Sequence, residues 1–221
     1  MMSAVKMIVL LVIAAAGTFG AVKYLRYYLE KKLEEPVELK HKDPFWYTLF
    51  GAVYALSAVG IFFLTQKKHE IFYFAIEYIL LTGILFLIAV IDLKAKKVPN
   101  KLVIALLAVR GAVMIAQLVH KPKEWKMIVL GSAFGFIIGA FIIFVCILIS
   151  RGGMGSGDMK LFAAIGLYFG FKGLIPVMMY SLVLSALVSI VLLISRKAKM
   201  KSTIAMAPFV YAGTLLYIVF I

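Results

Sequence analysis

Long apolar runs, separated by short charged segments, constrain this chain more than any other feature of its sequence. Hydrophobic residues make up 64% of its 221 residues, and a helix that spans a bilayer needs about 20 mostly apolar residues. The sequence therefore predicts an all-α fold, a polytopic membrane helix bundle with eight transmembrane helices. Seven are possible, because the sixth span is short and could form a tight pair with the seventh. The expected spans are roughly 7–25, 45–64, 71–91, 102–119, 127–149, 158–171, 173–194 and 204–221.

A single integral membrane domain accounts for residues 1–221 on this interpretation. The only substantial polar stretch before the second span is residues 29–45, which mixes both charge signs and contains Pro36 and Pro44. It is too short to form a domain. It is predicted to be a short cytoplasmic loop between the first two helices, either a plain connector or a lid.

The net charge of +14 lies mainly in the short loops between spans, which favours membrane orientation over nucleic-acid binding as its role. If the amino terminus is outside, four segments are cytoplasmic and hold 16 of the 24 Lys and Arg residues, against seven in the outer segments. The sequence thus predicts a multi-pass protein of the inner cell membrane with no nucleic-acid partner. The four cytoplasmic segments are 23–42, 92–101, 150–160 and 196–201.

A glycine-rich turn precedes Asp158, one of only ten acidic residues in the chain, and a long apolar run follows it. The structural explanation is a helix N-cap, in which Ser156 or Asp158 accepts hydrogen bonds from free amides and the helix dipole favours the negative charge. The glycines add a functional explanation, because a backbone without side-chain walls lets another chain approach closely or lets the loop hinge. These glycines are Gly152, Gly153, Gly155 and Gly157.

A second acid, Asp92, follows the third apolar run and is expected at a helix C-terminus, where the dipole disfavours an anion. No cap explains this position. The lysines around it either keep it ionised or mark the cytoplasmic boundary, so an interfacial acid in a basic loop is the structural alternative. Pro99 ends the same loop and suits the first turn of the fourth helix.

Asp92 and Asp158 are expected at the same membrane face, since one ends a helix that runs inward and the other begins a helix that runs outward. Two carboxylates that face each other in a low dielectric share a proton, because both cannot ionise easily. One can then activate water as a base while the other polarises a peptide carbonyl as an acid. This is aspartic peptidase chemistry, which needs no cofactor and no metal. The single cysteine, Cys146, also excludes a cysteine-based zinc site.

Two further charged residues, Glu77 and Arg110, are expected inside the membrane on the third and fourth helices. Their depths differ by roughly 4–5 Å at the helical rise per residue, and an intramembrane charge is costly enough to require a partner. We expect a structural ion pair between them. A proton or ion pathway is the alternative, although transporters usually show broken helices in repeated halves.

The stretch GSGDMKLFAAIGLYFG, residues 155–170, resembles the G-x-G-D-x-K-L-x-A-x-x-G pattern of the type IV prepilin peptidases and related preflagellin peptidases. Asp92 and the VPNKL that follows resemble the first-aspartate motif of that family, an acid ahead of an I/V-P-D/N-x-L segment. The stretch IAMAPFVYAG, residues 204–213, is similar to the segment that opens the family's last helix. Together these motifs cover about 89–213.

The resemblance implies a membrane aspartic endopeptidase that removes short basic leaders from prepilin-like or pseudopilin precursors at the cytoplasmic face. Asp92 and Asp158 are then the catalytic pair, and the precursor's apolar helix lies beside the enzyme in membrane lipid. The resemblance implies an active-site loop with Gly155, Gly157 and Lys160, although a lysine that extends to the membrane interface is the alternative for Lys160. Substrate-binding residues are expected at Gly152, Gly153, Pro99 and Asn100.

Many bacterial members of this family carry a cytoplasmic insert with paired cysteines between the first two helices, linked with N-methylation of the new pilin end. This chain has only the short 29–45 segment there, without cysteines. We therefore expect it to resemble the form without the cysteine-rich domain and to lack methyltransferase activity.

Three other functions fit parts of the pattern. A presenilin-like intramembrane protease shares the Gly-x-Gly-Asp turn, but such enzymes have a Tyr-Asp partner and a Pro-Ala-Leu element where this chain has Ile91–Asp92 and Ala207–Pro208–Phe209. A cation-coupled transporter could use the two acids as carboxylate ligands, yet both are expected near one face only. If the protein were only a structural assembly platform, the glycine-rich turn and the paired acids would have no explanation.

Overall fold

A computed structural model describes residues 2–32, 48–49, 51–57, 59–61, 72–150, 155–195 and 204–220. The elements in these ranges are helices, and five of them are long and apolar enough to cross a membrane. The prediction of an all-α, multi-pass membrane protein is confirmed. The chain divides into two compact units, Met1–Leu87 and Ile88–Ile221.

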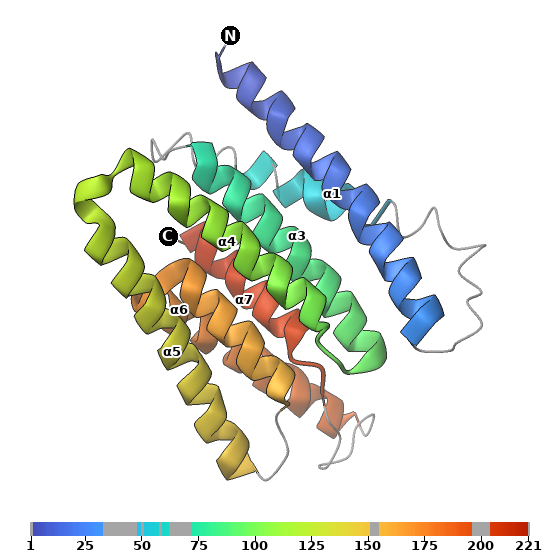
Figure 1. Ribbon diagram of the computed structural model, residues 1–221. Coiled ribbons are helices and arrows are strands. Elements are labelled where there is room, and N and C mark those ends of the chain that lie inside the picture. The colour runs from blue at the N-terminus through green and yellow to red at the C-terminus, as the bar shows by residue number, and fades with distance from the viewer. Residues whose placement is uncertain are drawn as a thin grey trace. The chain divides into compact units, whose positions relative to one another are not determined.

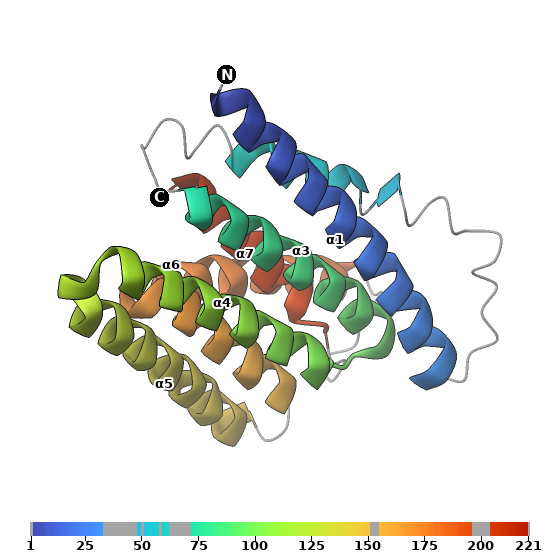
Figure 2. The same ribbon diagram turned by 45° about the horizontal axis from the view of Figure 1, so that its top comes forward.

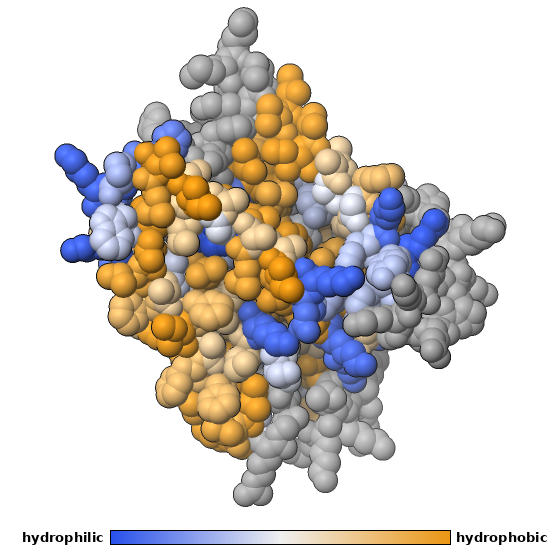
Figure 3. Space-filling model, in the orientation of Figure 1, coloured by the Kyte–Doolittle hydropathy of each residue, from blue (hydrophilic) through white to orange (hydrophobic). Residues whose placement is uncertain are grey.

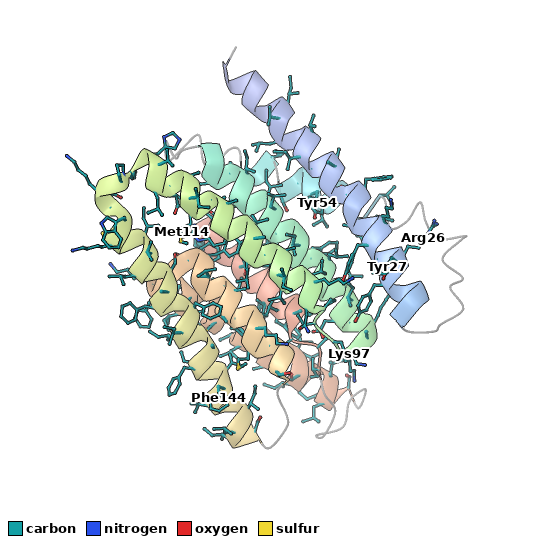
Figure 4. The ribbon with its side chains drawn as sticks, viewed as in Figure 1. Arg26, Tyr27, Tyr54, Lys97, Met114 and Phe144 are labelled. Atoms are coloured by element: carbon teal, nitrogen blue, oxygen red, sulfur yellow. The ribbon has the colours of Figure 1, made fainter. Side chains whose placement is uncertain are left out.

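The Met1–Leu87 unit contains α1 (Met2–Lys32), a shorter apolar helix at Gly51–Ile61 and most of α3 (Phe72–Ala95). Tyr54, labelled in Figure 4, is buried and packs its ring against the backbone of Gly17 and Gly83, where a larger residue would collide with it. Residues 33–47 lie outside the described part of the chain, so the prediction of a connector or lid at 29–45 stays a prediction.

The Ile88–Ile221 unit continues from the end of α3 into α4 (Asn100–His120), the short 3-10 helix η2 (Pro122–Glu124) and α5 (Trp125–Ser150). It then forms α6 (Ser156–Ile194) and α7 (Ala207–Phe220). The first residues of α4, α6 and α7 lie toward the same end of these helices in both Figure 1 and Figure 2. Residues with the predicted site motifs therefore come together at one end of this unit.

A break at Gly170 divides α6 into two helices. Gly170 has φ 63° and ψ −173°, a backbone conformation that costs glycine little but strains residues with a Cβ atom. The chain reverses there, and the two halves run back along each other in Figures 1 and 2. This is the tight pair that the sequence predicts for the sixth and seventh spans.

The α5 and α6 helices pack with their backbones in direct contact. A Cβ atom added at Gly135 would collide with the carbonyl oxygen of Gly166, and one added at Gly166 would collide with that of Gly135. One turn further along, a Cβ atom at Gly139 would lie 2.6 Å from the carbonyl oxygen of Phe162. Small residues allow this approach in membrane helices, where van der Waals packing drives association. The first half of α6 is thereby held inside the unit, and its residues from Leu161 to Gly166 are buried.

The opposite side of α5 is apolar and exposed. Large apolar side chains such as Phe134, Phe141 and Phe144 are largely accessible, and this side of α5 is orange in the hydropathy view of Figure 3, with Phe144 labelled in Figure 4. In a membrane protein such a surface contacts acyl chains rather than water.

Helix ends differ from the expected spans. The third span was expected at 71–91, but α3 continues to Ala95, so Asp92 lies in its last turn. The last span was expected at 204–221, but α7 begins only at Ala207 and has 14 residues. The second span was expected at 45–64, of which the structure describes the helix Gly51–Ile61.

Candidate active site

Asp92 lies in the last turn of α3 and is buried, with 5% of its surface exposed. The helix ends three residues later. Lys96 follows it in the left-handed region with φ 49°, and its amide donates to the carbonyl oxygen of Asp92 at 2.8 Å. This is the usual left-handed ending of a helix, and it turns the chain sharply into the segment that leads to α4.

The carboxylate of Asp92 binds the first amides of α7. Its Oδ2 accepts a hydrogen bond from the amide of Ala207 at 3.0 Å, and the neighbouring amide of Met206 also favours the ionised carboxylate. Free amides and the positive end of the helix dipole suit a carboxylate at this position. The sequence analysis found no cap for Asp92 because the capped helix is another one, 115 residues further along the chain.

Asp158 is the third residue of α6 and is partly buried. Its Oδ2 accepts a hydrogen bond from the amide of Gly155 at 3.1 Å, and its own amide donates to the carbonyl oxygen of Gly155 at 3.1 Å. The N-cap of α6 is therefore Gly155, neither Ser156 nor Asp158 as predicted, and Asp158 accepts from the amide of that cap from the third position of the helix. This hydrogen bond holds the Asp158 carboxylate in place, and it does not exclude a role for that carboxylate in proton transfer.

The two aspartates therefore share one arrangement, because each carboxylate is held by backbone amides at a helix N-terminus. They are also close enough for the charge of Asp92 to act on Asp158 through space. Both residues belong to the Ile88–Ile221 unit. The sequence analysis expected them at the same depth, and here they lie at the same end of the unit, near the first residues of α4, α6 and α7.

The segment between α3 and α4 lies against the first turn of α6. A Cβ atom on Gly157 would lie 3.0 Å from the Cβ and Cγ2 atoms of Val98, so these two residues are in tight contact. Pro99 is buried and precedes the first residue of α4. From the start of that helix, the Oδ1 of Asn100 accepts a hydrogen bond from the Nζ of Lys160 at 2.9 Å.

The predicted site residues are thus partly brought together. Gly155, Gly157 and Lys160 lie on the first turns of α6, and Pro99 and Asn100 lie beside them. Gly152 and Gly153 lie outside the described residues. Their predicted substrate-binding role stays a prediction.

Four lysines surround this end of α3 and α4. All four are exposed, and Figure 3 shows a blue patch where Figure 4 labels one of them, Lys97. We call this set the basic rim. It consists of Lys94, Lys96, Lys97 and Lys101.

Arg110 is buried in the middle of α4 and joins three helices. Its Nε donates to the carbonyl oxygen of Leu167 at 2.9 Å, its Nη2 to the Oγ of Ser132 at 2.9 Å, and its Nη1 to the Oε1 of Gln117 at 3.4 Å. Leu167 lies just before the break at Gly170, where carbonyl groups lose their helical partners. Arg110 therefore donates a hydrogen bond to a carbonyl group at the end of the first half of α6.

The predicted ion pair between Glu77 and Arg110 stays a prediction, since the two residues belong to different units. Glu77 is buried, with 2% of its surface exposed. The sequence analysis missed Ser132, Gln117 and the carbonyl oxygen of Leu167 as partners of Arg110. A signal existed for one of them, because Gln117 follows Arg110 by two helical turns and lies on the same face.

Among the described residues, no three His, Cys, Asp or Glu side chains come together as a group that could hold a metal ion. The polar groups at the site are two carboxylates, the amides that hold them, one lysine and one asparagine. This set can exchange protons with water and with a peptide, and that is the chemistry that the two aspartates predict.

Comparison with known families matches residues 79–194 to the type IV leader peptidase family. This match covers most of α3, all of α4 and α5, and α6 to its last residue. The chain belongs to the type IV leader peptidase family. The match begins before Asp92 and includes Asp158, Lys160 and Asn100, so the predicted family is confirmed, although the third motif, residues 204–213, lies beyond the matched residues.

Two curated relatives carry the same name, prepilin leader peptidase/N-methyltransferase. The protein of Bacillus subtilis (strain 168) is 31% identical over 134 residues, which are 61% of this chain and 51% of the relative. The protein of Xanthomonas campestris pv. campestris is 30% identical over 127 residues, which are 56% of this chain and 43% of the relative. This leader peptidase family member thus aligns with about half the length of each relative. No solved structure matches the chain.

Proposed function

We propose that this protein is an aspartic endopeptidase that cleaves the short basic leader from prepilin-like precursors at the cytoplasmic membrane face, with Asp92 and Asp158 as its catalytic pair. One observation carries the proposal: two carboxylates on different helices, each held by helix N-terminal amides, lie close enough to act on each other. Family membership supports the reaction class.

The reaction follows from two carboxyl groups that share one proton. The ionised carboxylate takes a proton from water as its oxygen attacks the carbonyl carbon of the scissile peptide, while the protonated carboxyl gives its proton to the carbonyl oxygen. The resulting diol collapses when its C–N bond breaks. The leaving nitrogen takes a proton from the carboxyl that had received it, and the diol returns one to the other, so the pair ends in its starting state.

The substrate class fits the position of the site. A precursor with a basic leader and an apolar helix would lie in the bilayer beside α4 to α7, with its cleavage point near the membrane surface. The amide hydrogen bonds of the substrate helix must open there before attack. The glycine-rich turn ahead of α6 provides a backbone with few side chains against which an extended segment fits.

Methyl transfer is a separate question, because both curated relatives carry a two-activity name and this chain aligns with about half of each. We propose peptidase activity alone, on the ground that the 29–45 segment holds no paired cysteines. Mass spectrometry of the released mature end, with S-adenosylmethionine present, tests this. A methylated end would contradict it.

The proposed pair is tested by cleavage of a membrane-inserted prepilin with the purified wild type and with Asp92→Asn and Asp158→Asn. We expect both variants to lose at least about 1,000-fold in kcat, because neither can complete the proton exchange. A metal chelator added in parallel should leave the wild-type rate unchanged. Melting temperatures establish that the variants are folded.

A matched control removes an acid outside the site. Glu124 is exposed on η2, at the connection between α4 and α5, where it pairs with Lys121 at 3.6 Å. Glu124→Gln should cleave at the wild-type rate. Full activity in either aspartate variant would exclude the catalytic pair, and absence of wild-type cleavage across pilin, pseudopilin and preflagellin substrates would exclude the proposed substrate class.

A further inference from the structure

The hydrogen bond between Lys160 and Asn100 connects the two segments that carry the aspartates. We propose that Lys160 and Asn100 are a positioning pair, which sets the distance between the Asp92 and Asp158 carboxylates and contacts neither the substrate nor the water molecule that attacks it. This inference rests on the proposed function and deepens it. It assigns Lys160 to the enzyme's own geometry instead of to substrate binding or to the membrane interface.

Asn100 and Lys160 each lie on a segment that also carries one of the two aspartates. Asp92 and Asn100 are eight residues apart on a short segment that turns at Lys96 and enters α4 after Pro99. Asp158 and Lys160 lie in the first turns of α6. A bond of 2.9 Å between Lys160 Nζ and Asn100 Oδ1 therefore joins the two catalytic segments directly. If either segment shifted relative to the other, this hydrogen bond would break.

Lys160 and Asp158 lie on different faces of α6. Residues three apart share a helix face, whereas residues two apart do not. Gly157 and Lys160 are three apart, and both contact the segment between α3 and α4, through Val98 and Asn100. Asp158 is two residues from Lys160 and so lies on a different face of α6. In this proposal the pair influences the reaction only by positioning the two aspartates.

The charges around Lys160 also favour a fixed hydrogen-bond acceptor. Lys160 lies near the basic rim, whose exposed lysines repel it, so its ammonium gains from an acceptor at a fixed place. Asn100 offers one at the first residue of α4, where the helix backbone fixes the side chain's origin.

The test is a double-mutant cycle on cleavage of the membrane-inserted prepilin. Asn100→Ala and Lys160→Met should each lower kcat about 10-fold and leave KM within about twofold, because a small misplacement of catalytic groups affects the chemical step. The double variant should be no slower than the single ones, since all three lack the same bond. Asn100→Asp should restore wild-type kcat, because its carboxylate still accepts from Lys160.

Two other results would contradict the proposal that Lys160 and Asn100 are a positioning pair. A double variant whose loss is the product of the single losses shows that the residues act independently. A raised KM with unchanged kcat in Lys160→Met shows that Lys160 binds substrate instead. Both residues are exposed, so the variants should fold, and an equal melting temperature for each variant checks this.

A second readout does not depend on cleavage. Spin labels on Lys101→Cys and Ser156→Cys, in a Cys146→Ala background, report the distance between the starts of α4 and α6 by pulsed electron paramagnetic resonance. The distribution should be narrow with the pair intact and broader with Asn100→Ala. An unchanged width overturns the positioning pair even if the enzyme is active. A broadened width with an inactive wild type supports the pair while excluding the proposed function.

Discussion

At the scale of single residues, Asp92 has two roles that substitution can separate. Its carboxylate is proposed to act on water, and it also holds the first amides of α7 through the bond to Ala207. Asparagine keeps an acceptor oxygen for that amide but cannot exchange a proton. This is why the amide variant, rather than alanine, tests the chemistry.

We predict that Asp92→Asn melts close to the wild type, whereas Asp92→Ala is less stable by about 1–3 kcal/mol, since it leaves buried amides without an acceptor. Thermal melts in one detergent measure the difference. Asp158→Ala is the matched control, because it removes a single bond at an exposed helix end and should cost less. Equal melting temperatures for Asp92→Asn and Asp92→Ala would exclude the α7 contact.

The sequence predicted these residues through spacing, but not their surroundings. Asp92, Asp158, Gly157, Lys160 and Asn100 follow from local motifs, because each motif fits within a few residues. The amides of Met206 and Ala207 could not be found this way. The stretch 204–213 that contains them was recognised as a motif, but its contact with Asp92 forms only on folding and involves a backbone amide, which no residue pattern specifies.

At the scale of helices, the contact between α5 and α6 depends on two glycines that meet backbone to backbone. Gly135 meets the carbonyl oxygen of Gly166, while a Cβ atom at Gly131, one turn earlier on α5, would have no heavy atom within 4 Å. On α5, an added Cβ atom would therefore collide with a neighbouring backbone at Gly135 but would meet open space at Gly131.

Gly135→Ala should lower stability by about 1–3 kcal/mol, because the added methyl must push two helix backbones apart. Gly131→Ala should leave the melting temperature unchanged or raise it, since alanine favours the helix. Peptidase activity should fall in the first variant only, as α6 carries Asp158. The packing would be wrong if both substitutions had the same effect on the melting temperature.

The lengths of the apolar runs predicted where the helices lie, and the charged residues between the runs predicted where most of the helices begin and end. The ends of α3 and α7 could not be predicted, because hydropathy does not report where a helix stops. The end of α3 is fixed by the left-handed Lys96, and a lysine in that conformation has no sequence signature. The break in α6 was expected near Lys172, the charged residue there, but the backbone turns at Gly170.

At the scale of the whole molecule, the distribution of lysine and arginine predicts which ends face the cytoplasm. The basic rim lies beside Asp92, and η2 lies at the other end of α4. In a Cys146→Ala background, Lys97→Cys and Lys123→Cys place one exposed thiol at each end of that helix.

We predict that a membrane-impermeant maleimide added to intact cells labels Lys123→Cys but not Lys97→Cys, which becomes reactive only after the cells are opened. The reason is that basic loops stay on the cytoplasmic side during insertion. Each variant is the control for the other. The reverse pattern would place the proposed active site outside the cytoplasm and contradict the proposed orientation.

The bond between Asp92 and α7 also has a consequence for the order in which the molecule is made. A ribosome that has added Asp92 must add 115 more residues before Ala207 exists. During that interval α3 to α6 can enter the membrane, but the first carboxylate lacks the amides that hold it in place. The proposed pair is therefore completed late in synthesis, by a helix that contributes no catalytic side chain of its own.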